Sequence, residues 1–174
     1  MEANLEQTLA NATIGEPLAF QINDKGENIK VSQALAERAR MTIDIVSPDL
    51  DKPVLDTVEF YEAIKTLPTG NRKARIRILI TDSEKIIKNG HRLLDLARRL
   101  PSFIEIKVQG KSFKDFCEAW LITDAKAWLR RPHADRYEAE VDFSSARKLR
   151  DILKDFEAMW NEAIHDPNLR RLSL

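Results

Sequence analysis

The densest group of residues able to bind a charged ligand lies in the sequence RRPHADRY, residues 130–137. Arginine can donate two parallel hydrogen bonds to a phosphate or a carboxylate, so a loop rich in arginine favours an anion site. An exposed loop in which Asp135 pairs with an arginine explains the same composition without a ligand. The residues of this loop that could bind an anion are Arg130, Arg131, His133 and Arg136.

Several aspartates gather near the end of a predicted strand at residues 41–46, and Asp49 and Asp51 are the ones that could reach the arginine-rich loop. Ligands of open α/β sheets tend to bind at the carboxyl ends of strands. The same aspartates could instead form structural salt bridges with the loop. The sequence leaves both interpretations open.

The three histidines lie far apart in the sequence, and the single cysteine has no partner at zinc-ligand spacing. We therefore predict no metal and no other cofactor. His91 follows Gly90 at the predicted start of a helix, where it could cap the helix or contact an anion bound at the helix N-terminus. His165 lies near the end of the last predicted helix, where its charge would complement the helix dipole.

Cys117 and Asp124 are the remaining candidates for catalysis. Cysteine can act as a nucleophile, but a single cysteine near an apolar segment is typical of a small buried strand residue. Asp124 follows an apolar run, where an aspartate commonly forms a turn. Because one cysteine cannot form an internal disulfide, the chain suits a reducing compartment, and we expect a cytoplasmic protein.

The charges balance overall, with 28 basic and 28 acidic residues, so net charge gives no argument for binding to nucleic acid or membranes. Their distribution is uneven. Residues 1–62 hold 5 Lys/Arg and 12 Asp/Glu, whereas residues 72–99 hold 9 Lys/Arg and 3 Asp/Glu. Two solvated faces of opposite sign explain this pattern. The alternative is a surface that binds anions or pairs with a second copy.

Strands and helices are predicted to alternate through the first two-thirds of the chain. Helical connections of this length imply a mostly parallel sheet with helices on both faces, hence an α/β fold. A strand-rich segment at residues 116–143 and a long helix at 144–164 follow. The earlier strands are expected at residues 18–22, 41–46, 74–81 and 103–108, and the helices between them at 28–40, 57–67 and 90–100.

The segment at residues 116–143 resembles the active-site half of the phospholipase D superfamily, which carries H-x-K-x-x-x-x-D followed by G-S-x-N. With Asp124 as the motif aspartate, Cys117 takes the histidine position and Ala119 takes the lysine position. Phe156 and Trp160 resemble the F-x-x-x-W pattern that often closes these domains. The positions of the glycine, serine and asparagine are taken by Arg131, Pro132 and Ala134.

The resemblance implies a phospholipase D-like half-domain with a mixed, largely parallel sheet. Phosphoryl transfer needs concentrated positive charge, and the motif lacks both its histidine and its lysine. We therefore expect a non-catalytic module that acts by binding or assembly, with a phosphate-bearing ligand or nucleic acid as its partner. Family members with one motif pair two half-domains, which implies a homodimer. The alternative is an enzyme that uses substituted residues around Asp124 and His133.

The expected organisation is a flexible N-terminal tail or weak helix at residues 1–14, one α/β domain at 15–165 and a short C-terminal tail at 166–174. The N-terminus is acidic and does not have the pattern of a signal peptide. No apolar run approaches the roughly 20 residues that a membrane-spanning helix requires.

Overall fold

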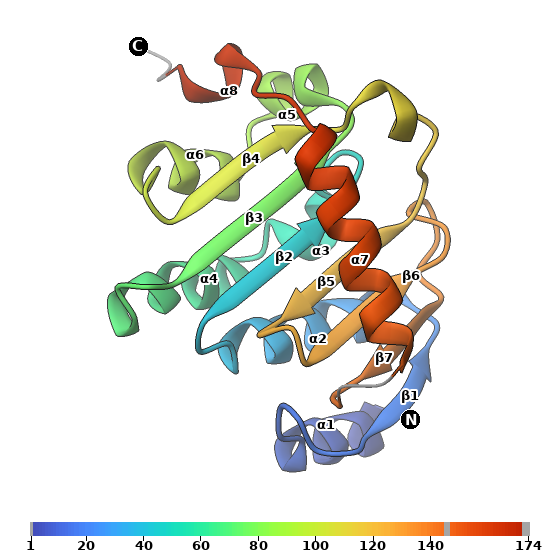
Figure 1. Ribbon diagram of the computed structural model, residues 1–174. Helices are drawn as coiled ribbons and strands as arrows, with labels where there is room; N and C mark the ends of the chain where they lie inside the picture. The colour runs from blue at the N-terminus through green and yellow to red at the C-terminus, as the bar shows by residue number, and fades with distance from the viewer. Residues whose placement is uncertain (1, 145–146, 172–174) are drawn as a thin grey trace.

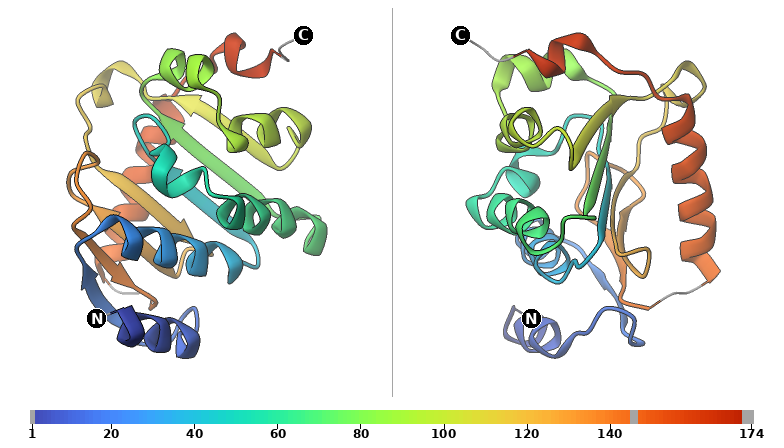
Figure 2. Two further views of the ribbon diagram at one scale, coloured as in Figure 1. Left: turned by 180° about the vertical axis from the view of Figure 1, so that it is seen from behind. Right: turned by 60° about the vertical axis from the view of Figure 1, so that its left-hand side comes forward.

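The computed structural model describes residues 2–144 and 147–171, which form a seven-stranded sheet with helices on both faces (Figures 1 and 2). The strand order is β1-β7-β6-β5-β2-β3-β4. The strands are β1 (Ala19–Ile22), β2 (Thr42–Val46), β3 (Arg75–Ile80), β4 (Ile104–Val108), β5 (Ala119–Thr123), β6 (Ala127–Arg131) and β7 (Ala139–Asp142). The helices are α1 (Glu2–Asn11), α2 (Lys25–Glu37), α3 (Lys52–Leu55), α4 (Val58–Gly70), α5 (Ser83–Asn89), α6 (Arg92–Arg99), the 3-10 helix η1 (Lys111–Phe113), α7 (Arg147–Glu162) and α8 (Pro167–Arg170).

The two faces of the sheet have separate apolar cores. Helix α7 lies along one face, and α2, α4 and α6 lie on the other (Figure 2). The α7 core includes Phe156 and Trp160, which pack with Trp120 and Trp128 of the β5–β6 hairpin. All five residues of β5 are buried, because this central strand is covered on both sides. The predicted α/β class with helices on both faces is confirmed.

The pairing of the strands differs from the predicted, largely parallel sheet. Only two pairings, β2–β3 and β3–β4, are parallel, and the other four are antiparallel. Strands β1 to β4 do run in one direction, as their helical connections require. The prediction of parallel pairing is wrong because β5, β6 and β7 insert between β1 and β2, which are therefore not neighbours.

The N-terminal region forms helix α1, which is the second of the two expected forms, rather than a flexible tail. Leu5 and Leu9 of α1 are buried in the main core. The guanidinium of Arg38 donates hydrogen bonds to the backbone oxygens of Leu9 (2.5 Å) and Ala12 (3.1 Å), so a cation satisfies the end of this helix. Residue 1 lies outside the described residues.

The C-terminal region also contributes to the core. Leu169 of α8 is buried, and the backbone of Ile164 pairs with Val108 at the outer edge of β4. The expected tail at residues 166–174 therefore includes an ordered turn of helix; residues 172–174 lie outside the part that the structure describes.

Candidate functional site

The β5–β6 hairpin separates the motif positions into two groups. Ala119 pairs with Arg131 at one end, and Thr123 pairs with Ala127 at the other. The backbone oxygen of Cys117 accepts a hydrogen bond from the amide of Ala134 (2.7 Å), which brings these positions together. The histidine, lysine, glycine and asparagine positions of the motif therefore share one end of the sheet, which we call the motif rim. Asp124 lies at the opposite end.

The motif rim borders an open hollow of about 500 Å³. Cys117 is exposed there, so the prediction of a buried strand residue is wrong; β5 begins two residues later. Among the side chains that line the hollow, three are aspartates, and only one is a lysine. The lining residues are Pro48, Asp49, Thr81, Lys114, Asp115, Phe116, Cys117, His133, Ala134 and Asp135.

Arg131 is occupied by internal partners. It is 4% exposed, and its guanidinium forms an ion pair with Asp51. It also donates hydrogen bonds to the backbone oxygens of Ala134 and Arg136, and it lies 4.8 Å from the centre of the Tyr137 ring. The predicted salt bridge between the aspartates after β2 and the arginine-rich loop is confirmed for Asp51, whereas Asp49 pairs with Lys85. Because Arg131 is buried and bound to internal partners, it is poorly accessible to a ligand.

Arg130 faces the other side of the sheet, because neighbouring residues of a strand point in opposite directions. Its Nε and Nη2 donate to the carboxylate of Glu118 at 2.6 and 2.7 Å. Burial raises the pKa of Glu118, but hydrogen bonds from Arg130 and Trp120 outweigh it, so the pKa lies below its usual value. His133 and Arg136 are exposed in the loop after β6. The four predicted anion ligands therefore do not converge on one point.

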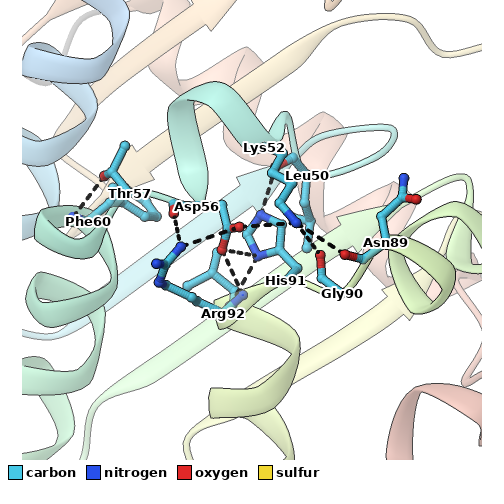
Figure 3. Close-up of polar contacts among 10 residues, drawn as sticks. Leu50, Lys52, Asp56, Thr57, Phe60, Asn89, Gly90, His91 and Arg92 are labelled. Atoms are coloured by element: carbon cyan, nitrogen blue, oxygen red, sulfur yellow. Dashed lines mark hydrogen bonds and ion pairs between the residues drawn. The ribbon is translucent and has the colours of Figure 1, made fainter.

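His91 is a buried helix cap, as one of the two interpretations predicted (Figure 3). Its Nδ1 accepts a hydrogen bond from the amide of Leu93 (3.1 Å), and Nε2 lies 3.0 Å from the backbone oxygen of Leu50. Nε2 therefore carries the proton and donates to that oxygen. Asp56 lies 3.6 Å from Nδ1 and accepts from the amide of Arg92 (2.8 Å). Both ring nitrogens serve the fold, and neither is free for an anion.

Protonation of His91 is expected to destabilise the protein. Burial lowers its pKa below the ordinary value of 6.5, although Asp56 opposes this effect. The unfolded chain then binds the proton more readily. The contribution of His91 to stability should be constant above about pH 6.5, fall by at most about 1.4 kcal/mol per pH unit as the pH drops towards the folded pKa, and level off below it. Urea unfolding of the wild type and of His91→Asn, which keeps a capping oxygen, should show this extra pH dependence in the wild type alone.

Asp124 forms the turn between β5 and β6, as predicted, with a backbone φ of 54°. Its carboxylate also accepts hydrogen bonds from three consecutive amides at the start of β2: Arg40 (2.8 Å), Met41 (2.7 Å) and Thr42 (2.9 Å). It is separated from His133 by the length of the hairpin, four residue steps or about 13 Å. The alternative of an enzyme that uses Asp124 and His133 together is therefore not supported by their positions.

A second group of charged residues lies at the end of the sheet that carries Asp124. All of its members are exposed, and none has an ion-pair partner among residues 2–144 and 147–171. Sequence reasoning missed this group because only part of it belongs to the basic block at residues 72–99. We call the group the amino-end cations, and it consists of Arg40, Arg72, Lys73, Arg75 and Lys126.

Within the described ranges, no group of three or more His, Cys, Asp or Glu side chains could hold a metal ion. No helix in the same residues is long and apolar enough to cross a membrane.

The sheet and its helices define a phospholipase D-like fold. Over 85% of this chain and 97% of the other, the structure superimposes on Nuc from Salmonella typhimurium, a phospholipase D family member, with a TM-score of 0.60 and 13% identity. NucT from Helicobacter pylori gives a TM-score of 0.60 at 11% identity, over 87% of this chain and all (100%) of that one. The predicted phospholipase D-like fold is confirmed.

The chain belongs to the family described as "Domain of unknown function (DUF7931)", which matches residues 24–172. No curated protein sequence matches it. The structure is also similar to that of TrmBL2, an archaeal chromatin protein described as showing a novel mode of DNA binding, with a TM-score of 0.63 and 15% identity. That match covers 94% of this chain but 60% of TrmBL2.

Proposed function

We propose that this protein is a non-catalytic phospholipase D-like module that acts by binding. The observation that carries the proposal is the ion pair between Arg131 and Asp51 at the motif rim. Arg131 takes the glycine position of the motif and pairs across the hairpin with Ala119, which takes the lysine position. The positive charge is thus retained at the rim but moved to the neighbouring strand, where an internal carboxylate neutralises it.

The surroundings of the rim also disfavour a phosphodiester. A phosphoryl group in its transition state carries negative charge on its oxygens, and catalysis depends on stabilising that charge. The hollow at the rim is lined by Asp49, Asp115 and Asp135 and by one lysine, Lys114. Asp49 is ion-paired with Lys85, and the structure records no ion pair for Asp115 or Asp135 among the described residues. Repulsion between a phosphate and these carboxylates would raise the barrier to reaction.

The structural neighbours support the proposal that the chain acts by binding. Nuc and NucT share the fold, and the DNA-binding TrmBL2 shows that a similar structure occurs in a protein that holds nucleic acid. We infer a phosphate-bearing ligand for this chain and assign it to the cytoplasm, which suits the free thiol of Cys117. We also propose that the chain forms a homodimer, as single-motif half-domains do. Light scattering should give twice the chain mass, and a monomer would contradict the pairing.

Hydrolysis assays test the absence of catalysis. We expect turnover of bis(p-nitrophenyl) phosphate and of labelled oligonucleotides to equal that of buffer, because Arg131 is ion-paired with Asp51 and aspartates outnumber lysines around the hollow. A nuclease with the intact motif serves as the positive control. Turnover above buffer that disappears in Cys117→Ala or His133→Ala would contradict the proposal, because these residues line the same hollow.

A further inference from the structure

We propose that the amino-end cations bind the phosphate backbone of a nucleic acid. The inference rests on the proposed function, since binding without hydrolysis is what it specifies. It places the ligand at the amino ends of β2 and β3, where Asp124 lies, and not at the motif rim.

The amino-end cations come from three loops that the sheet brings side by side. Lys126 lies in the turn after β5, Arg40 precedes β2, and Arg75 begins β3. Strands β5, β2 and β3 are neighbours, so their ends form one continuous edge (Figure 1). Two strand spacings of about 4.8 Å make this edge about 10 Å wide. That width matches roughly three phosphate spacings of about 3.4 Å along one strand of a duplex.

Two polar side chains tie these loops together without neutralising the cations. Asp124 binds the backbone amides of Arg40, Met41 and Thr42. The side chain of Asn71 donates to the backbone oxygen of Arg40 (2.8 Å) and accepts from the amide of Lys73 (2.9 Å). The backbones that carry the cations are therefore held in place before any ligand binds. A preorganised site loses less conformational entropy on binding.

The acidic groups near this edge have other partners. The two carboxylate oxygens of Asp124 accept from three backbone amides. Glu37, which borders the hollows on both sides of Arg40, accepts a hydrogen bond from Gln33 (2.7 Å). These donors are neutral, so both carboxylates keep their charge, but the amino-end cations outnumber them. The excess positive charge attracts a polyanion and releases the counterions condensed on it.

The composition of the edge favours nucleic acid over a membrane surface. Membrane binding by a protein surface requires a substantial apolar area beside the cations. Met41, which is 48% exposed, is the large hydrophobic residue found at this edge. The other exposed large hydrophobic side chains of the described ranges are Val58, at the distant start of α4, and Ile164, beside the end of β4.

Fluorescence anisotropy with labelled single- and double-stranded oligonucleotides tests the inference, with titrations from low to near-physiological salt. If all the amino-end cations contact duplex phosphates, the logarithm of the binding constant should fall with the logarithm of salt concentration with a slope of about −4.5, since each contact contributes about −0.9. Lys73→Ala/Arg75→Ala removes two contacts and should reduce that slope by about 1.8 in magnitude.

Lys111→Ala/Lys114→Ala is the matched control, because it removes the same charge from exposed residues near the motif rim. We expect this variant to keep the wild-type slope. An equal reduction of the salt slope in both variants would contradict the assignment of the binding site. No binding at low salt would also contradict it. Binding to anionic vesicles but to neither oligonucleotide would overturn the choice of ligand. Cleavage of a bound oligonucleotide would overturn the proposed function and leave the binding site intact.

Discussion

We expect Asp124→Ala to lower the free energy of unfolding by about 2–4 kcal/mol, because the substitution removes the acceptor for three backbone amides. Each hydrogen bond to a carboxylate contributes about 1.5–3 kcal/mol when it is buried. The amides of Arg40 and Met41 belong to exposed residues and can bind water instead, so the total is smaller than three full contributions. Alanine also fits the left-handed conformation at this position less well than aspartate does.

Asp124→Asn separates these two effects. Asparagine tolerates the left-handed conformation and keeps one acceptor oxygen but loses the charge. Urea unfolding followed by circular dichroism should place this variant between the wild type and Asp124→Ala. If Asp124→Ala changed stability by less than about 0.5 kcal/mol, as ordinary surface substitutions do, the hydrogen bonds to the start of β2 would contribute little to the fold.

Both substitutions at Asp124 should also affect ligand binding at the edge of the sheet that carries the amino-end cations. Without the carboxylate, the loop that carries Arg40 loses two of the contacts that hold it beside Lys126. We infer that ligand affinity would fall although none of the amino-end cations has been removed. The salt slope should change less than the affinity does, because the slope counts phosphate contacts and the affinity also includes the entropy of ordering the loop.

The sequence predicted which segments form strands and helices better than it predicted their neighbours. Alternation of Ile76, Ile78 and Ile80 with a second set of residues on the other face is a local signal, and the three isoleucines are buried in β3 as expected. The insertion of β5–β7 between β1 and β2 is a non-local event, which no local pattern reveals. The three amides bound by Asp124 lie 82–84 residues away in the chain, so the sequence indicated a turn but not its partners.

The contacts of the candidate site were also only partly predictable from local sequence patterns. The sequence places Arg130 and Arg131 together, yet a strand directs neighbouring side chains to opposite faces. Arg130 therefore meets Glu118 on one face, and Arg131 meets Asp51 on the other. Once residues 127–131 are assigned to a strand, this separation follows from the alternation alone. The amino-end cations could not be found in this way, because Arg40 and Lys126 approach β3 only through the strand order.

The ion pair of Arg131 gives the second large expected effect. We expect Arg131→Met to lower the free energy of unfolding by about 3–5 kcal/mol, because it leaves a mostly buried carboxylate without a partner. The side chain of Asp51 is 14% exposed, so water compensates only in part. Two backbone oxygens that Arg131 binds, those of Ala134 and Arg136, would also lose their donor.

Arg130→Met is the matched control, since it removes the same charge from the adjacent residue of β6. Its ion pair with Glu118 is more exposed, with side chains 26% and 20% accessible, and we expect a loss of about 1 kcal/mol. Adding Asp51→Asn to Arg131→Met should recover part of the stability, because no unpaired charge remains. A double-mutant cycle with a coupling energy near zero would show that Arg131 and Asp51 do not stabilise each other. The motif rim would then hold a free cation, and catalysis at that end of the sheet would have to be considered again.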